Sequence, residues 1–186
     1  MRTRTTWIIT GVLAALVLAA AVMFTISQTG DGGPETSAPP GDAEHGLEGP
    51  QPETADPATA ARHALAAMFS WQPAVDPSPG QGLVRARPWL TGQLADQADA
   101  PPATGVRPLP DWAAWRNSRD VVTATVAADQ ISDTDDGECV VTATVTQIVQ
   151  HTDGSSTRYR VMTVSAAMQH TDHGWRMSSY RLTTPN

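Results

Sequence analysis

The last third of the chain contains four segments in which apolar and polar residues alternate, separated by short turns. They span residues 121–131, 138–150, 157–169 and 174–182. Alternation with period two and enrichment in Val, Thr and Ile are typical of β-strands that have one covered face. The separators contain Asp-Gly or His-Gly and leave no room for a crossover helix, so consecutive strands must pair as antiparallel hairpins. We therefore predict a four-stranded antiparallel sheet.

Helical signals precede these strands. Asp56 is a good N-cap and Pro57 fits the first helical position, so we predict a helix over residues 57–71. A weaker helical pattern over residues 82–97 is interrupted by Pro88 and by a glycine, and we expect short pieces there. Since helices come first and a meander follows, the predicted fold class is α+β, with N-terminal helices packed on a curved four-stranded antiparallel sheet.

The N-terminal region carries a long uncharged stretch over residues 7–26, directly after Arg2 and Arg4. As a helix it would be roughly 30 Å long, enough to cross a bilayer. The positive-inside rule then places residues 1–6 in the cytoplasm and everything after the helix outside. We predict a single-pass protein of the cell membrane with an extracytoplasmic C-terminal domain. The alternative is a cleaved secretory signal ending near residues 19–21, which delivers the rest to the same side.

Residues 27–56 join this stretch to the predicted domain, residues 57–186. They contain five prolines, six glycines and seven carboxylates, with no basic residue. Such a segment buries too little apolar surface to offset the entropy of ordering, so we predict a disordered acidic tether. The chain's formal net charge of −7 comes mainly from this tether. An acidic chain lacks the basic footprint that nucleic acid needs, so we expect no nucleic-acid partner.

Several short motifs follow the predicted anchor and tether. They are Phe69-Ser70-Trp71, Asp76-Pro77-Ser78-Pro79, Arg87-Pro88-Trp89-Leu90, the pair Trp112 and Trp115, and Gly174-Trp175-Arg176-Met177. Over most of residues 56–182 the chain resembles small membrane-anchored proteins with an NTF2-like (cystatin-like) domain. Similar proteins include bitopic scaffold subunits of type IV secretion and of conjugation machines in Gram-positive bacteria, and membrane proteins associated with mammalian-cell-entry lipid importers. The resemblance implies an NTF2-like fold but matches no catalytic signature.

The anchor, the tether and this resemblance together favour a non-enzymatic assembly or docking module of a bacterial envelope complex, in conjugation, secretion or lipid import. All twelve basic residues are arginine, which suits a bacterium with high-GC codon usage. The expected partners are proteins of that complex or a second copy, paired through the open face of the sheet. Two alternatives remain: a small apolar ligand bound in the cone between sheet and helices, or a hydrolase or isomerase with a hidden site.

Tryptophan dominates the aromatic content of the predicted domain. The five indoles outside the anchor are Trp71, Trp89, Trp112, Trp115 and Trp175. Each can bury roughly 200 Å², so core or rim packing is the favoured interpretation. Trp112 and Trp115 stand three residues apart and can share one helix face. An indole that stays exposed is a typical anchor at protein interfaces, so Trp112, Trp115 and Trp89 are the candidate docking residues.

Polar residues supply weaker candidates for chemistry. Enzymes with the NTF2-like fold usually place an Asp/His pair inside the cone, and the resemblance makes His63 and Asp120 the candidates here. His151 and His170 stand near strand ends, where ordinary rim histidines are the more common case. Nothing in the spacing of these residues establishes a general base within reach of a substrate.

No metal site or cofactor is expected. The sequence His-Thr-Asp-His at residues 170–173 offers two imidazoles and one carboxylate on a single turn, which is a strained arrangement for zinc. The acidic residues between 133 and 138 lack the spacing of a calcium loop. The single cysteine, Cys139, excludes a disulfide framework within the chain and is predicted to be a half-buried strand residue.

Overall fold

The computed structural model describes residues 49–101, 109–135 and 137–183. The predicted transmembrane segment 7–26, the cytoplasmic segment 1–6 and most of the tether lie outside the described residues, as does most of the proline-rich loop before α4. Within the described ranges, no helix has the length and apolar character needed to span a bilayer.

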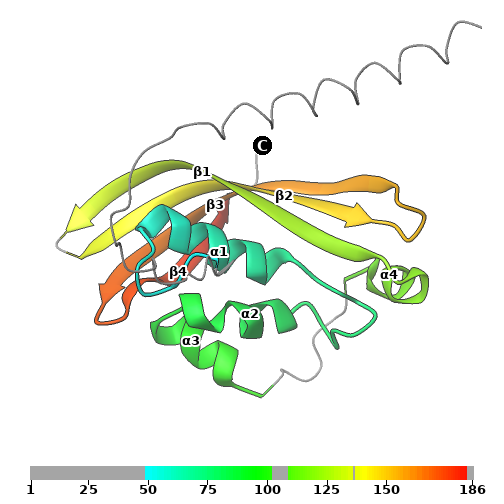
Figure 1. The fold of residues 1–186 in the computed structure, drawn as a ribbon, viewed down its shortest axis with the longest axis horizontal. Helices are drawn as coiled ribbons and strands as arrows, with labels where there is room; N and C mark the ends of the chain where they lie inside the picture. The colour runs from blue at the N-terminus through cyan, green and yellow to red at the C-terminus, as the bar shows by residue number, and fades with distance from the viewer. Residues whose placement is uncertain (1–48, 102–108, 136, 184–186) are drawn as a thin grey trace, which may run out of the picture. The chain divides into compact units, whose positions relative to one another are not determined.

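The sheet contains β1 (Val121–Asp135), β2 (Glu138–Gln150), β3 (Ser156–Thr171) and β4 (Gly174–Thr183). The strands lie side by side in the order β1-β2-β3-β4, and each neighbouring pair is antiparallel (Figure 1). This confirms the predicted meander. The predicted bounds of β2 match at both ends, whereas the other strands extend a few residues further because hairpin pairing continues into the turn residues.

The first helix begins where its capping residue predicts. In α1 (Pro57–Phe69), Asp56 is the N-cap, and its Oδ1 accepts a hydrogen bond from the backbone N–H of Thr59 at 2.9 Å. The helix ends two residues before Trp71, because the backbone of Trp71 pairs with Val122 of β1 in both directions, at 2.7 and 2.9 Å. The chain thus leaves α1 as an extended segment on the edge of the sheet.

The weaker helical region forms short pieces, as predicted. They are α2 (Gln81–Ala86), a 3-10 turn over Arg87–Trp89 and α3 (Gly92–Asp99). The breaks fall at Pro88 and at Gly92, which has φ +53°, a conformation that favours glycine. Gly82 allows α2 to pack closely on α1, since a Cβ there would lie 2.2 Å from the carbonyl oxygen of Met68. The last helix, α4 (Trp112–Ser118), precedes β1.

Helices α1, α2 and α3 lie on one face of the curved sheet (Figure 1). On β2 the buried positions alternate strictly with half-buried ones, and the buried set faces the helices: Cys139, Val141, Ala143, Val145, Gln147 and Val149. The predicted α+β class is therefore confirmed, and the arrangement is consistent with an NTF2-like fold. The prediction for Cys139 needs correction, because it is only 2% exposed: its register opposite Met168 places it in the core.

Candidate functional site

The tryptophans of α4 are core residues. Trp112 and Trp115 are 4% and 7% exposed and form a cluster with Trp71, Val122 and Val149. The ring centroids of Trp71 and Trp112 lie 6.0 Å apart in an edge-on arrangement. A helix as short as α4 is not stable alone, so it must bury its aromatic side against the sheet. Their burial agrees with the favoured interpretation of core packing and corrects the alternative in which Trp112 and Trp115 are docking residues, because almost none of their area is accessible.

Trp89 lies elsewhere, on the turn between α2 and α3. Its ring stacks on that of His63 from α1, with centroids 4.7 Å apart and planes 15° apart. Trp89 is half-buried and packs at the border of the main core, so part of its indole remains accessible. Its role in docking stays a prediction. The contact also accounts for His63, whose ring packs against an indole rather than next to a carboxylate.

Asp120 contacts His151 rather than His63. Asp120 is 6% exposed, and its Oδ2 lies 3.1 Å from Nδ1 of His151, at the end of β2. Nε2 of the same imidazole lies 3.0 Å from the hydroxyl of Thr157. A buried carboxylate, an imidazole and a hydroxyl in series is the arrangement that activates a nucleophile in hydrolases. None of the three lines either of the two cavities described below, and the series links the residue before β1 to the residue after β2 and to β3.

The two histidines of the β3–β4 hairpin have different neighbours: His173 lines a cavity described below. His170 packs edge-on against Trp175, with ring centroids 5.2 Å apart. In the described part of the chain, no three His, Cys, Asp or Glu side chains come close enough together to hold a metal ion.

The other face of the sheet, which we call the open face, carries no helix of the described residues (Figure 1). Cross-strand pairs such as Thr125 with Thr146, and Thr144 with Thr163, place hydroxyls and methyls side by side on it. Most of its members are uncharged: Thr123, Thr125, Ala127, Val140, Thr142, Thr144, Thr146, Ile148, Val161, Thr163, Ser165 and Ala167. The same register also places Glu138, Arg158 and Arg181 on this face, with Arg158 opposite Ile148 and Arg181 opposite Ser165.

Charged residues stand around the border of the open face. Asp129 on β1 accepts a hydrogen bond from the Thr144 hydroxyl at 2.8 Å, and Arg181 on β4 pairs with Ser165. Glu138 and Arg158 lie at opposite ends of the face. Asp129 thus reaches the middle of β2, whereas the other charged residues stand toward the border. A mainly uncharged centre inside a charged border is the anatomy of a protein interface.

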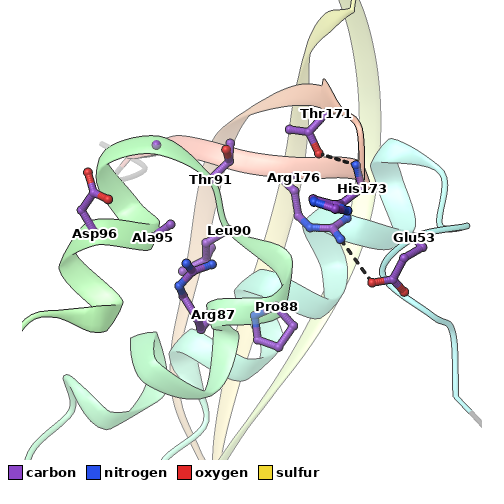
Figure 2. A pocket seen from close by; sticks show the side chains of 11 residues that line it. Glu53, Arg87, Pro88, Leu90, Thr91, Ala95, Asp96, Thr171, His173 and Arg176 are labelled. Atoms are coloured by element: carbon purple, nitrogen blue, oxygen red, sulfur yellow. Dashed lines mark hydrogen bonds and ion pairs between the residues drawn. The ribbon is translucent and has the colours of Figure 1, made fainter.

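The helix side contains two cavities. An apolar one of about 260 Å³ lies among the three N-terminal helices and β4, with Met68, Phe69, Leu83, Leu94 and Tyr180 in its wall. A more polar one of about 490 Å³, which we call the Arg176 cavity, has Glu53, Arg87, Thr91, Asp96, His173 and Arg176 in its wall (Figure 2). The apolar cavity occupies the place between sheet and helices where the resemblance predicts a cone.

Arg176 fastens the end of the tether to the sheet. The residue is 6% exposed, and its Nη1 donates to the carbonyl oxygens of Pro52 and Trp175 at 2.7 and 3.0 Å. Burial lowers the pKa of this guanidinium, and the charge of Glu53 partly offsets the effect. Gly174, at φ +89°, admits the approaching chain, because a Cβ there would lie 2.6 Å from the carbonyl oxygen of Glu53. Pro52 and Glu53, which the sequence assigned to the tether, are thus packed on the folded part.

No protein-family model matches the chain, and neither does any curated protein. Among solved structures, the chain is similar to CagV, a VirB8 homolog of the type IV secretion system from Helicobacter pylori, with 10% identity and a TM-score of 0.46 over 68% of this chain and 95% of that one. It is also similar to an IcmL-like type IV secretion system protein from Legionella pneumophila, with 9% identity and a TM-score of 0.44 over 69% and 92%.

A third similar structure is an Ntf2-like protein involved in plasmid conjugation, with 12% identity, a TM-score of 0.43, and coverage of 68% of this chain and 47% of that one. These three structures are secretion and conjugation proteins, whereas another similar structure is the intermembrane space region of the chloroplast protein ARC6, with 15% identity and a TM-score of 0.37 over 69% of this chain and 97% of that one. Because these TM-scores lie below 0.5, the likenesses carry no conclusion about what this chain does.

Proposed function

We propose that this chain is a non-enzymatic, membrane-anchored docking module of a bacterial envelope complex, in conjugation, secretion or lipid import. Its open face is the surface that binds a protein partner or a second copy. The observation that carries the proposal is an uncovered sheet face on which most side chains are uncharged.

A sheet face left to water alone usually carries mixed charges, which favour solubility. Here the central strands β2 and β3 present threonines, small residues and the apolar side chains of Ile148 and Val161 instead. Val161 is 45% exposed. Burying the centre of such a face desolvates few charges: the Asp129 carboxylate accepts a hydrogen bond from the Thr144 hydroxyl and keeps that partner, whereas Arg181 on the edge strand β4 can stay in contact with water.

The predicted anchor puts the open face on the outer side of the membrane. A transmembrane helix over residues 7–26, with Arg2 and Arg4 on the cytoplasmic side, holds the domain outside the membrane. The acidic tether leaves the domain free to turn toward a partner within roughly 30 Å of the bilayer. Pro52 and Glu53 fix the point at which the tether leaves the folded part.

Photo-crosslinking in the native cells tests this proposal. A photoreactive residue replaces Thr144 at the centre of the open face, and a control probe replaces Asn117 on the exposed side of α4. We expect a protein adduct from position 144 and none from position 117. An adduct of twice the chain's mass identifies a second copy, and any other mass identifies another subunit. Absence of an adduct from position 144 contradicts the proposal.

A second function is favoured by the apolar cavity. Its walls of Met68, Leu83 and Leu94 would suit a small apolar ligand of a few carbon atoms, with the Tyr180 hydroxyl as a polar contact. Native mass spectrometry of the full chain from its own cells tests this function. A retained small molecule supports it, and Leu83→Trp, which fills the cavity, should then abolish retention.

A further inference from the structure

The Arg176 cavity has a composition that the docking function does not require. It lies between the turn from Arg87 to Gly92 and the β3–β4 hairpin, and Figure 2 shows polar side chains around it. Two arginines and a histidine line it, together with Glu53 and Asp96. A cavity of about 490 Å³ is within the usual size of small-ligand sites.

Arg176 has N–H donors in this cavity that its two hydrogen bonds to carbonyl oxygens do not use. A guanidinium carries five N–H donors, and both hydrogen bonds of Arg176 to carbonyl oxygens use Nη1. Nη2 lies 3.6 Å from Oε1 of Glu53, which is beyond hydrogen-bonding distance. The Glu53 side chain is 61% exposed, so it is a weak partner for a buried charge. The buried guanidinium is therefore hydrogen-bonded through Nη1, whereas the partner of Nη2 is the long ion pair with Glu53.

The opposite wall supplies further donors. Thr91 precedes α3 but makes no side-chain cap, so the first N–H groups of this eight-residue helix lack a side-chain acceptor. Gly92 has no atom within 4 Å of the position of a Cβ, which leaves the helix start accessible. Arg87 donates from Nε to Asp99 at 2.7 Å, and this bond leaves its terminal nitrogens for another acceptor.

We propose that the Arg176 cavity binds a phosphate-type oxyanion, and that Glu53 is a resident carboxylate which the anion displaces. Tetrahedral oxyanions accept several hydrogen bonds at once, and arginine together with a helix N-terminus is a common way to supply them. With Glu53 displaced, the charges of Arg87 and Arg176 are balanced by those of Asp96 and of Asp99, which binds Arg87, so no excess of negative charge opposes an anion. The phosphate group can belong to a free anion or to a lipid headgroup, and this site does not depend on docking at the open face.

Calorimetric titration of the full chain in an uncharged detergent tests the site at constant ionic strength. The probe is inorganic phosphate, and glycerophosphoglycerol, a soluble lipid headgroup, is the second ligand. Arg176→Gln should weaken binding at least about tenfold, as expected for loss of a charge-assisted hydrogen bond. Glu53→Gln should strengthen it about two- to fivefold, because a competing carboxylate is removed. Arg181→Gln, an exposed arginine of β4 outside the cavity, is the control and should change nothing.

The two ligands separate the sources of the phosphate group. Tighter binding of glycerophosphoglycerol supports a lipid headgroup, and tighter binding of inorganic phosphate supports a free anion. If Arg176→Gln unfolds, Glu53→Gln still tests the proposal, because the Glu53 side chain is exposed. The proposal is overturned if neither ligand binds. It is also overturned if Glu53→Gln binds the ligands no tighter than the natural chain does.

Discussion

The two faces of the sheet are built from alternate residues of the same strands, yet only one of them is covered by helices of the described residues. On β2, Val141, Ala143 and Val145 are fully buried beneath the helices, whereas Thr142 and Thr144 between them are half-buried on the open face. The covered face contributes folding free energy through contact with α1, whose Ala60, Ala61 and Ala64 allow close approach. The open face has no such cover within the described residues.

Residue type alone does not separate the covered face of this sheet from the open face. Valine and threonine have nearly the same shape, so the backbone accepts either on both faces. They differ because threonine carries a hydroxyl, which needs a hydrogen-bond partner when burial removes its water. Substitutions on the covered face should therefore change folding, and substitutions on the open face should change association.

The largest expected effect is on the covered side, in the tryptophan cluster. Trp112→Ala removes a buried indole between Trp71 and the sheet, and we expect a loss of about 3–5 kcal/mol in the free energy of unfolding. Urea unfolding of the purified chain measures it. Trp89→Ala, at a half-buried position, should cost clearly less. Equal losses from the two variants would remove the distinction between core and accessible tryptophans.

Exchanging valine and threonine at two neighbouring positions of β2 compares the two faces directly. Val145→Thr places a hydroxyl in the core and should lower the free energy of unfolding by about 2 kcal/mol, because the hydroxyl loses its water without gaining a partner. Thr146→Val, on the open face, should change it by less than about 0.5 kcal/mol. Thermal unfolding of both variants measures the difference. A cost for Thr146→Val as large as that for Val145→Thr would show that something covers the open face.

A smaller effect is expected at the start of α1, which covers the sheet. Asp56→Ala removes the N-cap and should cost about 1 kcal/mol at neutral pH. Hydrogen bonds from Thr59 lower the pKa of Asp56 from its ordinary value of 3.8. Its contribution is therefore fully present above pH 3.8 and is lost as the pH falls through the lowered pKa.

Unfolding curves of the natural chain and the variant should accordingly converge in acid. Asp56→Asn is the matched control, since asparagine caps a helix about as well but carries no charge to lose. A gap between the natural chain and Asp56→Ala that stays constant to pH 2 would contradict the role given to the carboxylate.

The elements could be predicted from the sequence because their signals are local. Alternation marks the strands, Asp56 and Pro57 mark the start of α1, and Pro88 marks a break. Contacts between distant residues could not be predicted in this way. Arg176 binds Pro52 across 124 positions, and Asp120 meets His151 rather than His63 across 31 positions.

Core or rim packing of the α4 indoles was the favoured prediction, but the sequence alone left docking as an alternative. Trp112 and Trp115 share one helix face in the sequence, but that face can turn toward the core or toward solvent. The direction is decided by Trp71, Val122 and Val149, which meet only once β1 and β2 are paired. Sequence reasoning also had no signal for the Arg176 cavity, since its walls come from separate segments of the chain.

Co-purification from the native cells tests the role of the open face most directly. Thr146→Arg introduces a charge at the centre of that face, where it should alter the free energy of unfolding by less than about 0.5 kcal/mol. Asn117→Arg on α4 is the control. The predicted result is that Thr146→Arg loses the protein, or the second copy, that the natural chain and Asn117→Arg retain. Retention of the same partner by Thr146→Arg, with the fold intact, would contradict docking at the open face.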